Sequence, residues 1–172
     1  PGGRIPIRID PGMAFGTGAH PSTQLCLALL ETLFDQRGPE SIGTVIDIGC
    51  GSGILSVAAL KLGSKFVLGV DIDEPAIVNS RENADNNEID SEAFELGVGS
   101  VDEVKAGKFS IKSAPLVLAN ILAPILIRLF EAGMADLIEP GGSIILAGIL
   151  EPQDEKVIAA SEKHGLTLAD RR

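Results

Sequence analysis

The segment from Val45 to Gly53 has the composition of a ligand-binding turn between a strand and a helix. It reads VIDIGCGSG, so that an apolar run is followed by glycines at alternate positions. Glycines there let the backbone turn sharply and let a ligand approach the main chain closely. Free N–H groups at the start of the next helix would favour a carboxylate or a phosphate. The segment therefore predicts a site for an anionic group, although a glycine turn alone is a weak signal.

The spacing of the glycines and the acidic residue before them narrow the class of ligand. Dinucleotide-binding dehydrogenases carry G-x-G-x-x-G, whereas the third glycine here comes one residue early. Asp47, two residues before Gly49, could accept a hydrogen bond from a ligand ammonium, directly or through water. A carboxylate in an apolar strand is costly unless something pairs with it. The pattern favours S-adenosylmethionine, with its methionine ammonium, and a purely structural turn would leave Asp47 unexplained.

Two further polar residues follow buried strands. Asp71 ends an apolar run 22 residues beyond Gly49, where an ionised carboxylate can accept both ribose hydroxyls of an adenosine. NAD would use the same position, and an exposed strand-end Asp is the plain structural alternative. Asn120 follows the apolar run from Leu116 to Ala119, and its amide could hold a nucleophilic amine without adding charge. The alternative role for Asn120 is to cap the next helix.

Alternating strand and helix patterns place these residues on a mostly parallel α/β sheet with helices on both faces. Carboxyl ends of strands are where open α/β sheets bind ligands. We expect one domain over residues 1–172, without a linker. The expected strands cover 4–10, 44–48, 66–70, 93–98, 116–119, 143–147 and the start of a last one at 167–169; the expected helices cover 23–34 (with Ser22 or Thr23 as N-cap), 54–62, 75–86, 124–138 and 154–164.

The residues above, together with a distinctive segment near the N-terminus, resemble the bacterial methyltransferases that modify ribosomal protein L11. The most specific part is DPGMAFGTG at residues 10–18, followed by His20 and Pro21. The resemblance extends from Asp10 to about Ala169. It implies a Rossmann-like, class I methyltransferase fold that transfers methyl groups from S-adenosylmethionine to protein amines.

The resemblance also implies roles for individual residues. Thr23 would contact the methionine part of the cofactor, Gly49 and Gly51 would line its amino-acid moiety, and Asp71 would hold the ribose. Asn120 would lie beside the methyl group and the incoming amine. Phe15 would pack against the cofactor, with ordinary core packing as the alternative. His20 would support the loop through a hydrogen bond, with catalytic acid–base work as the alternative.

The chain departs from the family pattern at three places. Ser22 stands where the family usually has Thr, which keeps a hydroxyl. Nothing corresponds to the family's N-terminal substrate-recognition domain, and no Trp-containing strand follows Ala169. We therefore expect a truncated C-terminal hairpin, which would leave the strand at 143–147 at or near an exposed edge and open to self-association.

Composition restricts the partners and the compartment. The formal net charge is −10 and Trp and Tyr are absent, which argues against direct nucleic-acid binding. No apolar run is long enough for a membrane span, and Cys26 and Cys50 are too few for a disulfide framework or a metal site, so we expect a cytoplasmic protein without a metal. Two other functions stay open: a nicotinamide-dependent oxidoreductase and a non-catalytic module that binds the cofactor.

Overall fold

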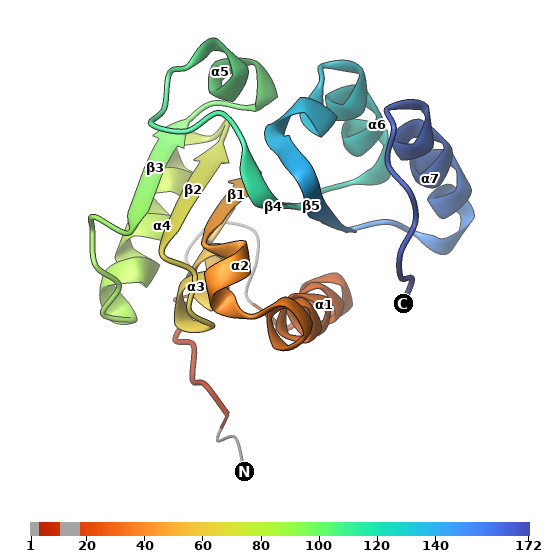
Figure 1. Cartoon of the computed structure of the whole chain (residues 1–172). Coiled ribbons are helices and arrows are strands. Elements are labelled where there is room, and N and C mark those ends of the chain that lie inside the picture. The colour runs from red at the N-terminus through yellow and green to blue at the C-terminus, as the bar shows by residue number, and fades with distance from the viewer. Residues whose placement is uncertain (1–3, 11–17) are drawn as a thin grey trace.

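A five-stranded parallel sheet forms the centre of the structure, a computed structural model that describes residues 4–10 and 18–172 (Figure 1). The three central strands are rich in Val, Ile, Leu and Ala, as expected where both faces of a parallel sheet are covered. The strands are β1 (Thr44–Ile48), β2 (Phe66–Asp71), β3 (Phe94–Val98), β4 (Ala114–Asn120) and β5 (Ile138–Ala147), in the spatial order β3-β2-β1-β4-β5. The expected parallel α/β fold is confirmed.

Helices cover both faces of this sheet (Figure 1). One face packs against α1 (Pro21–Arg37), α2 (Pro39–Ile42), α3 (Ile54–Lys61) and α4 (Glu74–Asn86). The other packs against α5 (Val101–Ala106), α6 (Ala123–Glu131), the 3₁₀ turn η1 (Met134–Leu137) and α7 (Asp154–Lys163), which follows the 3₁₀ turn η2 (Glu151–Gln153). None of the described helices is both long and apolar enough to span a bilayer.

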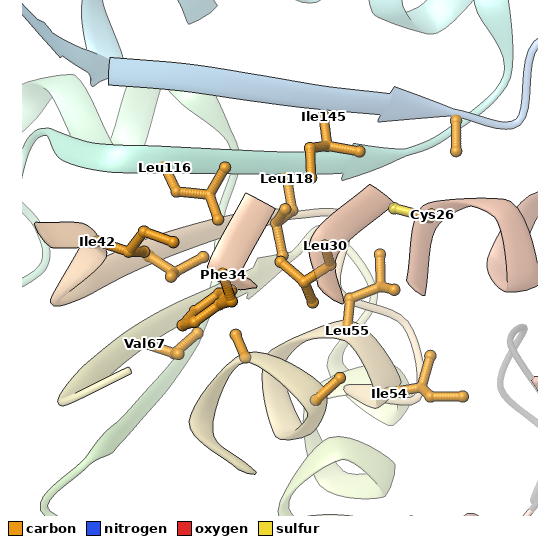
Figure 2. Close-up of a cluster of buried hydrophobic side chains, with 14 of the residues drawn as sticks. Cys26, Leu30, Phe34, Ile42, Ile54, Leu55, Val67, Leu116, Leu118 and Ile145 are labelled. Carbon is orange, nitrogen blue, oxygen red and sulfur yellow. The ribbon is translucent and has the colours of Figure 1, made fainter. Parts of the chain in front are cut away.

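Successive residues of each strand contribute to two separate cores. Val45 packs with α1 and α3 on the first face, whereas Ile46 packs with α5 and α6 on the second. Figure 2 shows the first core, where Leu30 and Phe34 of α1 meet side chains of α3 and the strands. This core fixes α1 across the sheet near β4 and β5, and so sets the position of its first turn relative to the carboxyl ends of the strands.

The segment Arg4–Asp10 is irregular, so the strand predicted there is wrong. The main chain of Arg8 exchanges hydrogen bonds with the Asn87 side chain, at 2.9 and 2.6 Å, and the Asp10 N–H donates to Asn83 Oδ1 at 2.8 Å. The alternation of apolar residues has a different cause, because Ile7 and Ile9 pack against the first core. The segment therefore satisfies its backbone on the side chains of a helix.

The helix predicted over 124–138 is also wrong in its length. It ends at Glu131, because Gly133 adopts a left-handed φ of 94° and starts η1. The strand β5 then begins at Ile138. It continues through Gly141 and Gly142, which were expected to end the preceding helix, and its register against β4 shifts along the way.

Two shorter elements also differ from expectation. The helix α5 was missed, although Ser100 and Glu103 form a capping box that marks its start. Residues 167–169 form no strand, because nothing pairs with them in the described part of the chain; Leu166 packs against the second core instead.

The N-terminus of α1 lies two residues earlier than predicted. His20 is the N-cap, and its Nδ1 accepts the Ser22 N–H at 3.2 Å and lies 2.7 Å from Ser22 Oγ. Pro21 follows as the first helical residue, where its missing N–H costs nothing. The supporting role expected for His20 is confirmed as a helix cap.

Candidate functional site

The carboxyl ends of β1, β2 and β4 bring three of the predicted residues to one edge of the sheet. The strand β1 pairs with β2 on one side and β4 on the other, all in parallel. Chain connectivity reverses direction at β1, which is where open α/β sheets bind ligands. Asp47 of β1 thus lies between strands that end in Asp71 and Asn120.

The turn after β1 needs glycine for both conformation and space. Gly49, Gly51 and Gly53 have φ values of 70°, 56° and 77°. The N–H groups of Gly49 and Cys50 both donate to the carbonyl of Val70, at 2.8 and 3.0 Å, which ties the turn to β2. A Cβ on Gly49 would lie 2.7 Å from Ile121 Cδ1, in the loop after β4. The predicted glycine turn is therefore confirmed as a close junction between the three strand ends.

Asp47 is a buried carboxylate with one oxygen left unpaired. Its side chain is 1% exposed, and Ser56 of α3 donates its hydroxyl to Oδ2 at 2.7 Å. Oδ1 is buried and has no hydrogen-bond partner among the described residues. Burial raises the pKa of Asp47 to about 7, with Asp71 adding to the rise and the Ser56 hydrogen bond opposing it. A cationic donor placed at Oδ1 would remove this cost.

Asp71 is held by two backbone amides. Gly51 N–H donates to Oδ2 and Asp73 N–H donates to Oδ1, each at 3.0 Å. A carboxylate oxygen can accept two hydrogen bonds, so each oxygen has capacity for a ligand hydroxyl. Asp73 occupies the N-cap of α4 without a side-chain capping bond, so Asp71 also stabilises this helix start. The structural alternative therefore accounts for only part of its hydrogen-bonding capacity.

Asn120 is joined to Thr23, although 97 residues separate them. Its Nδ2 donates to Thr23 Oγ1 at 3.2 Å, and Thr23 is buried in the first turn of α1. The N-cap of α6 is Leu122, which excludes helix capping as the role of Asn120. Gly148 packs against Ile121 so closely that a Cβ there would lie 2.7 Å from the Ile121 carbonyl oxygen. This close packing of Gly148 against Ile121 thus fixes the backbone directly after Asn120.

Apolar side chains near Asp71 were missed by sequence reasoning. Ile72 is 80% exposed directly after Asp71, and Val98 is 38% exposed at the register position opposite Asp71 in β3. Large apolar residues exposed at a strand end beside a polar site suit a flat ligand ring. The signal in the sequence was an apolar residue continuing past the strand-end Asp.

The distinctive N-terminal segment is only partly described. Phe15, predicted to pack on the cofactor, lies outside the described residues, as do the rest of 11–17. Gly18, the last residue of that segment, has a φ of 79°, and a Cβ on it would lie 2.9 Å from Ile54 Cδ1. Because Ile54 follows Gly53 directly, the end of the segment lies beside the glycine turn.

Together these residues form a candidate site that offers three distinct kinds of contact to a ligand. A cation would pair with Asp47 Oδ1, vicinal hydroxyls would donate to Asp71, and an apolar ring would cover Ile72 and Val98. The neutral amide of Asn120 lies across the turn, on α1's side of the site.

Comparisons with known proteins identify the family of the chain. A sequence profile of the family described as "Ribosomal protein L11 methyltransferase (PrmA)" matches residues 2–172. Ribosomal protein L11 methyltransferases from Geobacter metallireducens and Nitrosomonas europaea are 44% and 47% identical, over 98% and 90% of this chain. These matches cover 51% and 48% of the two relatives, so the chain spans about half their length.

Solved structures show the same fold. The ribosomal protein L11 methylase of Lactobacillus delbrueckii subsp. bulgaricus superposes with a TM-score of 0.73 at 34% identity, covering 96% of this chain and 80% of that one. The precorrin-6y C5,15-methyltransferase of Geobacter metallireducens superposes with a TM-score of 0.66 at 16% identity, over 87% of this chain and 75% of that one. The latter likeness concerns the fold alone.

Proposed function

Because the chain belongs to the ribosomal protein L11 methyltransferase family, we propose that it binds S-adenosylmethionine and transfers its methyl group to amines of a ribosomal protein. The observation that carries this proposal is that Asp47 Oδ1, buried at the glycine turn, has no hydrogen-bond partner within residues 4–10 and 18–172. A buried carboxylate oxygen without a donor is rare, and its natural complement is a cation. The methionine ammonium of the cofactor supplies one.

The remaining residues fit the other parts of the cofactor. Gly49 and Gly51 would approach the amino-acid moiety, and Thr23 would contact its methionine part from α1. The ribose hydroxyls would donate to Asp71, and the adenine would cover Ile72. Phe15 stays a proposed contact on the strength of the family resemblance alone.

Asn120 is the proposed catalytic residue. S-adenosylmethionine carries the methyl group on a sulfonium sulfur. A neutral amine nitrogen can attack this methyl group and displace the sulfur from it. Because an N–H of the Asn120 amide is used by Thr23, its oxygen would accept an N–H of the incoming amine and direct the nitrogen lone pair at the methyl group. Positioning of this kind can supply most of the acceleration without a strong base.

A ribosomal protein is the proposed substrate because the relatives are named for L11 methylation. A net charge of −10 is consistent with attraction of a basic protein. We also propose a cytoplasmic location, where the buried Cys26 and Cys50 would stay reduced.

The proposal is tested by incubating the protein with purified ribosomal protein L11 and S-adenosylmethionine carrying a deuterated methyl group. Mass spectrometry of L11 should show added labelled methyl groups on amine nitrogens, at a rate lowered strongly by Asn120→Ala. Cofactor binding without transfer to L11 would favour a non-catalytic binding module or another substrate. Failure to bind S-adenosylmethionine would overturn the proposal.

A further inference from the structure

The helix α4 buries polar residues on the face turned toward the glycine turn. Asn79, Ser80 and Asn83, together with the C-cap Asn87, are each at most 7% exposed, at positions where an amphipathic helix would normally carry apolar side chains. Buried amides and hydroxyls are costly unless hydrogen bonds satisfy them. The hydrogen bonds that these side chains form therefore indicate the role of this helix face.

Two of these side chains hold consecutive carbonyls of the glycine turn. The Ser80 hydroxyl donates to the Gly51 carbonyl at 2.7 Å, and Asn83 Nδ2 donates to the Ser52 carbonyl at 2.9 Å. In a trans peptide the C=O and the next N–H point in opposite directions. Turning the Gly51 carbonyl toward α4 therefore turns the following N–H, that of Ser52, away from the helix. The turn approaches Ser80 so closely that a Cβ on Gly53 would lie 3.0 Å from its hydroxyl.

Asn83 also reaches the N-terminal segment. Its Oδ1 accepts the Asp10 N–H at 2.8 Å, so that one amide bridges the segment Arg4–Asp10 and the glycine turn. Asn87, one helical turn later, bonds the same segment through both main-chain groups of Arg8. Its side chain also donates to the Asn83 carbonyl of α4 at 2.8 Å.

We propose that Asn83 and Ser80 are positioning residues that set the shape of the glycine turn for cofactor binding, and that Asn83 ties this shape to the segment Arg4–Asp10. The proposal rests on the proposed function for its ligand. Neither side chain needs to touch the cofactor, because each acts through a backbone carbonyl of the turn. Loss of either bond would let the turn relax toward conformations that bind less well.

The test compares Asn83→Ala with Asn87→Ala. Both remove a buried Asn, one in α4 and one at its C-cap, that accepts a backbone N–H from the N-terminal segment, but of the two only Asn83 bonds the turn. We expect Asn83→Ala to raise the Kd for S-adenosylmethionine about tenfold, and Asn87→Ala to change it less than about twofold. Both should lower the unfolding midpoint. Equal effects of the two variants on Kd, or none from Asn83→Ala, would overturn the proposal.

A milder pair covers the case in which Asn83→Ala does not fold. Ser80→Ala removes the bond to the Gly51 carbonyl and the 3.6 Å contact with Cys50 Sγ, both of them to the glycine turn. Its control, Ser64→Ala, removes part-buried bonds to the carbonyls of Gly43 and Phe66, at the other end of the sheet. Ser80→Ala should raise the Kd several-fold and Ser64→Ala should leave it unchanged.

A readout without ligand separates this proposal from the proposed function. Amide NMR shifts of Gly51 to Gly53 should move in the ligand-free Asn83→Ala and Ser80→Ala variants, and stay in place in Asn87→Ala. Unmoved shifts would overturn the positioning role. Failure of the wild-type protein to bind S-adenosylmethionine, with the shifts moving as expected, would instead contradict the proposed function.

Discussion

At the scale of single residues, the proposed site depends on Asp47, of whose two carboxylate oxygens only one has a partner in the described part of the chain. Ser56 fixes Oδ2 of Asp47, and the buried Oδ1 is left for a ligand. A buried acceptor with a fixed orientation, such as Oδ1, favours a cationic ligand and adds to its affinity. A water molecule could supply the missing donor only by entering the buried site. The same arrangement makes Asp47 sensitive to pH.

Cofactor affinity should therefore rise with pH up to about pH 7. Burial, with Asp71 nearby, raises the pKa of Asp47 to about 7, and a bound ammonium would favour the ionised form. Binding below that pH must release a proton, so the Kd for S-adenosylmethionine should fall from about pH 5 to about pH 7 and then level. Calorimetry across this pH range should show that Asp47→Asn binds S-adenosylmethionine more weakly and that its Kd hardly changes with pH. A pH dependence of the Kd in this variant as steep as in the wild type would exclude Asp47 as its source.

The same raised pKa has the opposite effect on the stability of the ligand-free protein. The folded state holds the proton to a higher pH than the unfolded chain, in which Asp47 has an ordinary pKa. The contribution of this carboxyl to the free energy of unfolding therefore declines as pH rises from about 4 to about 7. Asp47→Asn keeps an acceptor for Ser56 and should lack this decline, which denaturant unfolding at several pH values would measure.

Asn120 should affect transfer more than binding. Replacing it with Ala removes the proposed contact to the amine and leaves Asp47 and Asp71 in place, so kcat should fall by roughly 10²-fold or more while the Kd for the cofactor changes by only a few-fold. Thr23→Val, which removes the hydroxyl that orients Asn120, should show a smaller loss of kcat. Steady-state kinetics with L11 would measure both, and an unchanged kcat in Asn120→Ala would refute the assignment.

At the scale of elements, the glycine turn is the junction between the strand ends. Gly49 combines a left-handed φ with contact to Ile121, whereas Gly141 has a similar φ of 77° and nothing within 4 Å of an added Cβ. Gly49→Ala should thus cost more stability than Gly141→Ala, by about 1–3 kcal/mol for the added overpacking. Denaturant unfolding of the two variants measures this difference. Equal losses in the free energy of unfolding would show that the Ile121 side chain moves aside without cost.

Sequence reasoning predicted the elements whose signals are local and strong. The strand β1 has the predicted bounds, and Asp71 ends β2 as expected, because a short apolar run between turn residues has few other solutions. One error occurred where side chains far along the chain decide the outcome. Arg4–Asp10 alternates like a strand, yet its main chain bonds the side chains of Asn83 in α4 and of Asn87 at the C-cap of that helix.

The candidate site follows the same division. The positions of Asp47 and Asn120 could be predicted from their strands, but the bonds to Ser56 and Thr23 could not, because neither spacing nor residue type specifies such pairs. The polar face of α4 was also missed. In the sequence its Asn and Ser residues resemble ordinary surface residues. Only the structure shows that they form hydrogen bonds with the glycine turn.

At the scale of the whole molecule, β5 is an edge strand, as predicted. It pairs with β4 alone among the described residues. An unpaired edge can add a strand from another copy. We expect concentration-dependent association in sedimentation velocity, with slower amide exchange in residues 138–147 at higher concentration. A monomer at every concentration, with unchanged exchange there, would contradict self-association through β5.

The central claim is that the edge formed by β1, β2 and β4 is a site for S-adenosylmethionine. Calorimetric titration of the wild-type protein and of Asp71→Ala, with Asp73→Ala as an exposed neighbouring control, tests it most directly. We predict binding of S-adenosylmethionine by the wild type, about a hundredfold loss in Asp71→Ala because a charged acceptor of two hydroxyls is removed, little change in Asp73→Ala, and no comparable binding of NAD. Tight binding of NAD, or an affinity for S-adenosylmethionine that Asp71→Ala leaves unchanged, would contradict the account.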